Sequence, residues 1–213
     1  KRLLHVLYFS DKPYSTLYAY LKALNYGARV GVSDNLANIY AVGSAIWCTV
    51  PVHALTPVTF NAARRMARQV GNPTLEAVAD AYVSMAAEVV NKPEEGLVYA
   101  DRAIRALKER GEYFALGLAY HSTPVLNALC GRFRQSFSVI DEHLRMASDT
   151  KSRQVYEWGL LNKSLIWAFL GEVSDQAVAD LQEAHQICIE TRDTPNIAYS
   201  KILQAFCHLR RKE

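Results

Sequence analysis

The chain contains 213 residues, half of them hydrophobic and about a fifth charged. This composition is that of a folded domain with a sizeable core, so it excludes an intrinsically disordered chain. The formal net charge of +3 is too small to indicate nucleic-acid binding by itself, and no run of apolar residues is long enough to span a membrane.

Apolar residues recur at helical spacing along the whole chain, and strand-like alternation is scarce. Proline opens several of the helical segments and glycine follows several of them, as expected of residues that start and stop helices. Taken in chain order, the pattern predicts about eleven helices, at residues 2–10, 14–30, 34–49, 57–70, 74–90, 93–110, 112–129, 133–150, 151–170, 175–191 and 195–210.

Two places interrupt this regularity. The connection at residues 50–57 is longer than the others, and Pro124 lies inside a predicted helix. An interior proline removes one backbone hydrogen bond and clashes with the preceding turn. We therefore expect a kink or a short break near residues 121–123.

Glycines mark a repeat in the sequence. Gly31, Gly71 and Gly111 are spaced by 40 residues (71−31 and 111−71), and Gly131 and Gly171 have the same spacing. A stack of helix pairs, each packed on its neighbours, explains this period. The prediction is an all-α, right-handed superhelical array of antiparallel helix pairs that forms one domain. Its expected units are 1–31, 32–71, 72–111, 112–150 and 151–193, followed by a final helix at 195–211.

The placement of small residues resembles the tetratricopeptide family. Ala23 stands twelve residues after Asp11, and Ala103 stands twelve residues after Asn91. In that family such small residues let the two helices of a pair approach closely. The chain departs from the family in two ways, because its period is near 40 rather than about 34 and His143 occupies one of the small positions.

The opening residues resemble a second group of proteins. Residues 7–13 and 24–27 are similar to the repeats that follow the ATPase module in multidomain signalling proteins with a cyclase or kinase module. This resemblance implies a sensing or partner-binding region of a longer, cytoplasmic protein. It implies no ATPase chemistry here, and the chain has no G-x-x-x-x-G-K-[ST] loop.

Cysteine and histidine side chains are the first candidates for metal binding. His185, Cys188, Cys207 and His208 could supply four ligands to zinc. Cys207 and His208 are adjacent, however, so they point about 100° apart on a helix. No C-x-x-C pair occurs, and we expect buried, reduced thiols with no metal and no cofactor.

Cys130 is the candidate nucleophile, with His121 or His143 as its base. Nucleophilic catalysis also needs a third group that orients the base and donors for an oxyanion, and the sequence indicates neither. A buried thiol and a surface histidine explain these residues better. We therefore expect no catalytic residues, and the chain is predicted not to be an enzyme.

Basic residues recur on successive predicted helices. Stacked helices could align them into a stripe that binds nucleic acid or an acidic partner. We favour the alternative that they are solvated cations near helix C-termini, where the helix dipole stabilises positive charge. The residues concerned are Arg64, Arg65, Arg68, Arg102, Arg105, Lys108, Arg132 and Arg134.

A concave groove is the predicted binding site. In tetratricopeptide arrays the first helix of each pair lines this groove, and the family spacing places Asn38, Glu88, His121, Trp158 and Lys201 there. Trp158 fits the core almost as well. An apolar groove with scattered polar groups suits a peptide, a partner helix or another domain of the parent protein.

The sequence therefore predicts a non-catalytic protein-interaction and regulatory module. It also allows a homo-oligomer. The alternative function is a small-ligand sensor, with its ligand near Pro124, that controls an attached ATPase, cyclase or transcription module.

Overall fold

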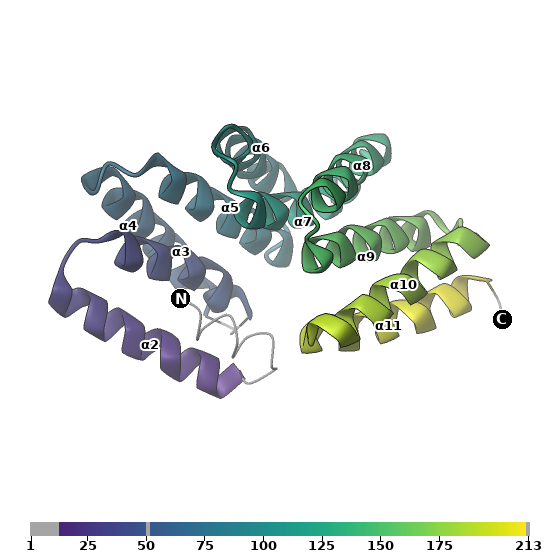
Figure 1. The fold of residues 1–213 in the computed structure, drawn as a ribbon, viewed down its shortest axis with the longest axis horizontal. Helices are drawn as coiled ribbons and strands as arrows, with labels where there is room; N and C mark the ends of the chain where they lie inside the picture. The colour runs from purple at the N-terminus through teal and green to yellow at the C-terminus, as the bar shows by residue number, and fades with distance from the viewer. Residues whose placement is uncertain (1–12, 50–51, 212–213) are drawn as a thin grey trace.

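The computed structural model describes residues 13–49 and 52–211 (Figure 1). Over these ranges the chain is all-α. It forms ten α-helices and one short 3-10 helix, His53–Leu55. The α-helices are α2 (Pro13–Val30), α3 (Asp34–Thr49), α4 (Thr56–Gln69), α5 (Pro73–Val89), α6 (Pro93–Arg110), α7 (Tyr113–Leu129), α8 (Phe133–Asp149), α9 (Arg153–Leu170), α10 (Asp175–Thr191) and α11 (Thr194–Arg211).

The helices pack in the order in which they follow one another in the chain. α3, α5, α7, α9 and α11 contact one another in succession and form an inner layer. α4, α6, α8 and α10 form an outer layer, and each of them packs on two neighbouring inner helices. The result is a curved array with α2 at one end and α11 at the other (Figure 1), an arrangement compatible with a helical repeat.

The composition of each helix explains its layer. α7 contains no Asp, Glu, Lys or Arg, and its residues from Leu116 to Ala128 are buried except for the half-buried His121. A helix that is apolar all round must be covered on every side. α6 carries many charged residues and buries one stripe that includes Leu97, Ala103 and Leu107, so it suits the outer layer.

Small residues allow the inner helices to approach closely. Ser84 on α5 and Ser122 on α7 are both fully buried, and their hydroxyl oxygens lie 2.8 Å apart. Between α7 and α9, a Cβ atom added to Gly117 would lie 2.8 Å from Cγ1 of Val155. A side chain at residue 117 would therefore push two inner helices apart.

His143 is the exception to the pattern of small residues. It is fully buried and stacks on Tyr120 with ring centroids 5.7 Å apart. Burial lowers the pKa of His143 to about 3, so the ring is neutral. Gly159 on α9 provides the space, because a Cβ atom there would lie 3.6 Å from Nδ1 of His143 and 2.6 Å from Cδ2 of Leu144.

The predicted helices within the described ranges are confirmed, with bounds that differ by a few residues at most. Gly31 has a φ of +92°, which confirms the left-handed conformation expected after the helix at 14–30. The helix predicted at 2–10 lies outside the described residues. No helix that the structure describes is both long enough and apolar enough to cross a bilayer.

The short break expected near residues 121–123 is absent, because α7 is helical without interruption from Tyr113 to Leu129. Thr123 Oγ1 donates to the carbonyl oxygen of Ala119 at 2.6 Å, and Ser136 Oγ on α8 donates to the carbonyl oxygen of Pro124 at 2.8 Å. Residues 122–128 are all buried, so the turn that contains the proline is covered by neighbouring helices.

We predict that Gly117→Ala destabilises the protein, although alanine normally favours a helix by about 1 kcal/mol over glycine. The new methyl group would meet Val155, whose β-branched side chain has few alternative rotamers, and overpacking of this kind costs about 1–3 kcal/mol. Urea denaturation measures the change. In a Val155→Ala background the same substitution should be neutral or stabilising, and additive effects of the two changes would contradict the close approach of α7 and α9.

Candidate functional site

The five predicted groove residues lie on five different helices of the inner layer. Asn38 is on α3, Glu88 on α5, His121 on α7, Trp158 on α9 and Lys201 on α11. Their exposure differs widely. Lys201 is exposed, Asn38, Glu88 and His121 are half-buried, and Trp158 is only 3% exposed. The structure brings two of them, His121 and Trp158, into contact.

His121 and Trp158 belong to a packed polar cluster between α7 and α9. Their ring centroids are 5.6 Å apart. The side-chain amide of Asn162 donates to the carbonyl oxygen of His121 at 2.6 Å and lies 3.3 Å from His121 Nδ1. Burial lowers the pKa of His121 to about 4, so its ring is neutral at physiological pH. The Trp158 ring is part of the interior and leaves almost no surface for a partner.

Asp193 connects this cluster to the last helix. Its Oδ1 accepts a hydrogen bond from the backbone N–H of Asn196 at 3.3 Å, as expected of a residue that caps α11. Its Oδ2 accepts from Gln154 Nε2 at 3.2 Å and from Trp158 Nε1 at 3.4 Å. One fully buried carboxylate thus holds α9 against the start of α11.

Glu157 is a second buried carboxyl group beside Asp193. It is fully buried, and its Oε2 accepts a hydrogen bond from Thr191 Oγ1 at 3.0 Å. Burial, together with the neighbouring Asp193, raises the pKa of Glu157 from 4.5 to about 8. At neutral pH Glu157 is therefore mostly protonated.

Glu88 is another carboxyl group with a raised pKa. It lies near the end of α5, and burial raises its pKa from 4.5 to about 7. Its charge contributes to raising the pKa of Tyr199 on α11, for which burial is the larger cause. The inner face near Glu88 therefore has a carboxyl group that titrates close to neutral pH.

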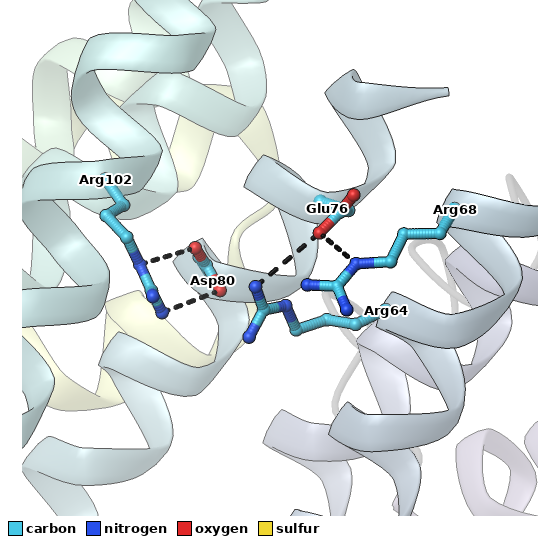
Figure 2. Close-up of polar contacts among 5 residues, drawn as sticks. All are labelled: Arg64, Arg68, Glu76, Asp80 and Arg102. Atoms are coloured by element: carbon cyan, nitrogen blue, oxygen red, sulfur yellow. Dashed lines mark hydrogen bonds and ion pairs between the residues drawn. The ribbon is translucent and has the colours of Figure 1, made fainter. Parts of the chain in front are cut away.

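Three of the arginines that could have formed a basic stripe, Arg64, Arg68 and Arg102, bind acidic residues of α5 instead. Figure 2 shows Arg64 and Arg68 of α4 on one side of Glu76, and Arg102 of α6 beside Asp80. Arg68 Nε lies 3.1 Å and Arg64 lies 3.5 Å from Glu76, and Arg102 Nε lies 3.1 Å from Asp80. These ion pairs hold the two outer helices to α5 and neutralise much of their charge.

The candidate zinc ligands serve other purposes. His185 Nδ1 lies 2.8 Å from Ser200 Oγ, and Cys188 and Cys207 are buried. Burial raises the pKa of both thiols above the ordinary range, so they are protonated. Among the described residues, no three His, Cys, Asp or Glu side chains are grouped so that they could hold a metal ion.

Cys130, the candidate nucleophile, lies in the turn after α7 and is half-buried. Partial burial and the nearby Glu94 raise the pKa of its thiol, and Arg132 opposes them only in part. A raised pKa keeps the sulfur as a thiol, whereas nucleophilic attack requires the thiolate.

An exposed aromatic surface on α2 was not predicted from the sequence. Tyr14, Tyr18 and Tyr26 are 88%, 63% and 61% exposed. Lys22 Nζ lies 5.5 Å from the ring centre of Tyr18 and 6.0 Å from that of Tyr26. We call these four residues the α2 tyrosine face. A signal for it exists in the sequence, because the four residues are spaced by four (18−14, 22−18 and 26−22) and so follow one side of a helix.

No known protein family matches the chain, and no curated protein is similar to it in sequence. Its function must therefore be inferred from its own surfaces. Among the described residues, Tyr14 is the most exposed large apolar side chain.

The buried pair of carboxyl groups predicts a pH-dependent stability. Because the fold raises the pKa of Glu157 from 4.5 to about 8, the stability that Glu157 contributes is complete below about pH 4.5 and is lost as the pH rises through 8. Glu157→Gln keeps a neutral group of the same shape. We predict that the melting temperature of the unmodified protein falls more between pH 5 and pH 8.5 than that of the variant.

Thermal unfolding followed by circular dichroism measures this difference. The matched control is Glu172→Gln, which changes an exposed carboxylate and should leave the pH profile of the melting temperature unchanged. Parallel profiles for Glu157→Gln and the unmodified protein would contradict the protonated state of Glu157.

Proposed function

We propose that the chain is a non-catalytic protein-interaction and regulatory module of a larger, cytoplasmic signalling protein. The observation that carries this proposal is the α2 tyrosine face. Tyrosine is enriched in the cores of protein–protein interfaces, because it offers a large rigid surface with a polar tip. Three tyrosines that are more than half exposed on one helix are more typical of a docking surface than of scattered surface residues.

The charge of α2 indicates an acidic partner. The helix contains Lys22 and Arg29 and no Asp or Glu. Lys22 lies between the rings of Tyr18 and Tyr26, so a partner carboxylate would meet a positive charge next to apolar surface. The surface thus suits a protein segment in which acidic residues stand beside apolar ones.

A protein partner explains this surface better than a nucleic acid. Strong binding to a nucleic acid requires many contacts with phosphates, and α2 provides only two cations. Three further arginines, Arg64 and Arg68 of α4 and Arg102 of α6, are bound to Glu76 and Asp80.

The environment of the candidate catalytic residues supports a non-catalytic role. The Cys130 thiol has a raised pKa, and the His121 and His143 rings are neutral because their pKa values are lowered by burial. His121 packs on Trp158 and His143 stacks on Tyr120. The two histidine rings are thus part of the packing between helices.

We further propose that the array is a right-handed superhelix of tetratricopeptide-like pairs with a period near 40, in the units predicted from the sequence. The successive contacts of the inner helices support this proposal. Binding in a concave groove through Asn38, Glu88, His121 and Lys201 stays a prediction. The packing around Pro124 does not favour a ligand there, because Pro124 and its neighbours Ser122, Thr123 and Val125 are all buried.

Selection from a displayed library of random peptides tests the proposed function. We expect the enriched peptides to combine acidic and apolar residues. We expect their affinity to fall by about tenfold or more in a Tyr14→Ser/Tyr18→Ser/Tyr26→Ser variant, since interface tyrosines are typical hot spots. These residues are exposed, so the variant should keep the circular dichroism spectrum of the unmodified protein.

The matched control is Tyr113→Ser, which changes a half-exposed tyrosine at the start of α7. Its affinity for the selected peptides should be that of the unmodified protein. A basic consensus, or equal binding by the triple variant, would refute the role of the α2 tyrosine face.

A further inference from the structure

A cleft of about 480 Å³ opens between the outer helices α4 and α6, next to the 3-10 helix. Its floor is the C-terminal half of α5, and its walls are the first turns of α4 and α6. The apolar lining residues are Ala54, Pro57, Phe60, Val83, Ala86, Ala87, Val90 and Tyr99. We call this the α4–α6 cleft. Its volume and its mainly apolar lining are those of a small-molecule site.

Two aromatic rings form part of the lining of the cleft. Phe60 of α4 and Tyr99 of α6 meet edge to face, with ring centroids 5.2 Å apart. Arg64 lies 5.5 Å from the ring centre of Phe60, and Arg102 lies 4.8 Å from that of Tyr99. Both arginines form ion pairs with carboxylates of α5, Arg64 with Glu76 and Arg102 with Asp80 (Figure 2). The aromatic wall is therefore fixed before any ligand binds.

The rim of the cleft is polar and includes one cation that can change partners. The polar lining residues are His53, Thr56, Asn61, Lys92 and Glu95. Lys92 Nζ lies 3.6 Å from Glu95 Oε2, and both side chains are more than half exposed. An ion pair this exposed is weak, so a ligand carboxylate can compete for Lys92. Lys92 at the rim favours a ligand that is an acid over one that is an amine, because its ammonium group attracts a carboxylate and repels a cation.

We propose that the α4–α6 cleft binds a small carboxylic acid with an aromatic or branched apolar body. The apolar body packs on Val83, Ala86 and Val90 against the wall of Phe60 and Tyr99, and the carboxylate binds Lys92 at the rim. This site is separate from the α2 tyrosine face, so it adds a small-molecule input to the proposed interaction module.

Three probes of the same shape test the charge preference: 4-phenylbutyrate, 4-phenylbutan-1-ol and 4-phenylbutylamine. Their dissociation constants are measured by titration of the ¹⁵N-labelled protein. We expect the acid to bind about tenfold more tightly than the alcohol or the amine, because a charge-assisted hydrogen bond is made only by the acid. Lys92→Gln should reduce acid binding to that of the alcohol.

Val90→Trp fills the cleft and should abolish binding of all three probes. Its matched control is Val89→Trp, which changes the neighbouring residue of α5 that is 57% exposed and lies outside the cleft. If Val90→Trp unfolds the protein, the Lys92→Gln variant alone tests the proposal. Lys92 is exposed, so its substitution should leave the fold intact. Equal binding of acid and alcohol, no effect of either substitution, or no binding at millimolar concentration would overturn the proposal.

Binding through the α2 tyrosine face and binding in the α4–α6 cleft can be tested separately. The Tyr14→Ser/Tyr18→Ser/Tyr26→Ser variant should bind 4-phenylbutyrate as the unmodified protein does. Loss of acid binding in that variant would contradict a separate cleft.

Discussion

The close approach of the inner helices is the constraint on which the rest of the structure depends. It requires residues with little or no side chain at the contacts, as with Ser84 against Ser122 and Gly117 against Val155. The outer helices bridge this layer and meet one another through large side chains such as Phe60 and Tyr99. A tight inner layer beneath a wider outer layer gives a curved array, and it opens a cleft between outer helices. The α4–α6 cleft is thus a consequence of the packing of α5 on its inner neighbours.

Buried polar groups in this protein organise the fold, and the surfaces suited to binding lie elsewhere. His121, Asp193 and Glu157 hydrogen-bond with partners from α9, α10 and the start of α11. The shifted pKa values of His121 and Glu157 follow mainly from burial, so a shifted pKa does not by itself identify a catalytic group. The exposed groups with unusual neighbours are Lys22 between two tyrosines and Lys92 at the rim of a cleft. Both offer positive charge beside apolar surface, and both indicate acidic partners.

Local signals made the helices predictable. Glycine at the helix ends and proline at the helix starts act within a few residues, so the bounds within the described ranges could be read from the sequence. The short break expected near Pro124 is absent. Residues 122–128 are buried against neighbouring helices, and a local rule does not include such packing. The family spacing placed Trp158 on an inner helix. Its burial could not be predicted in this way, because it depends on contacts with His121 of α7 and with Asp193, which are distant in the sequence. The pairing of Arg102 with Asp80 likewise joins residues of different helices. The α2 tyrosine face, by contrast, follows a spacing of four and could have been predicted.

The most direct test of binding through α2 is to map a selected acidic peptide on the protein by backbone amide chemical shifts. The account predicts that the perturbed amides cluster on α2, from Tyr14 to Val30, and that those near Glu88, His121 and Lys201 do not move. Perturbations centred on these inner-layer residues, with α2 unchanged, would contradict it and would place the partner in the concave groove.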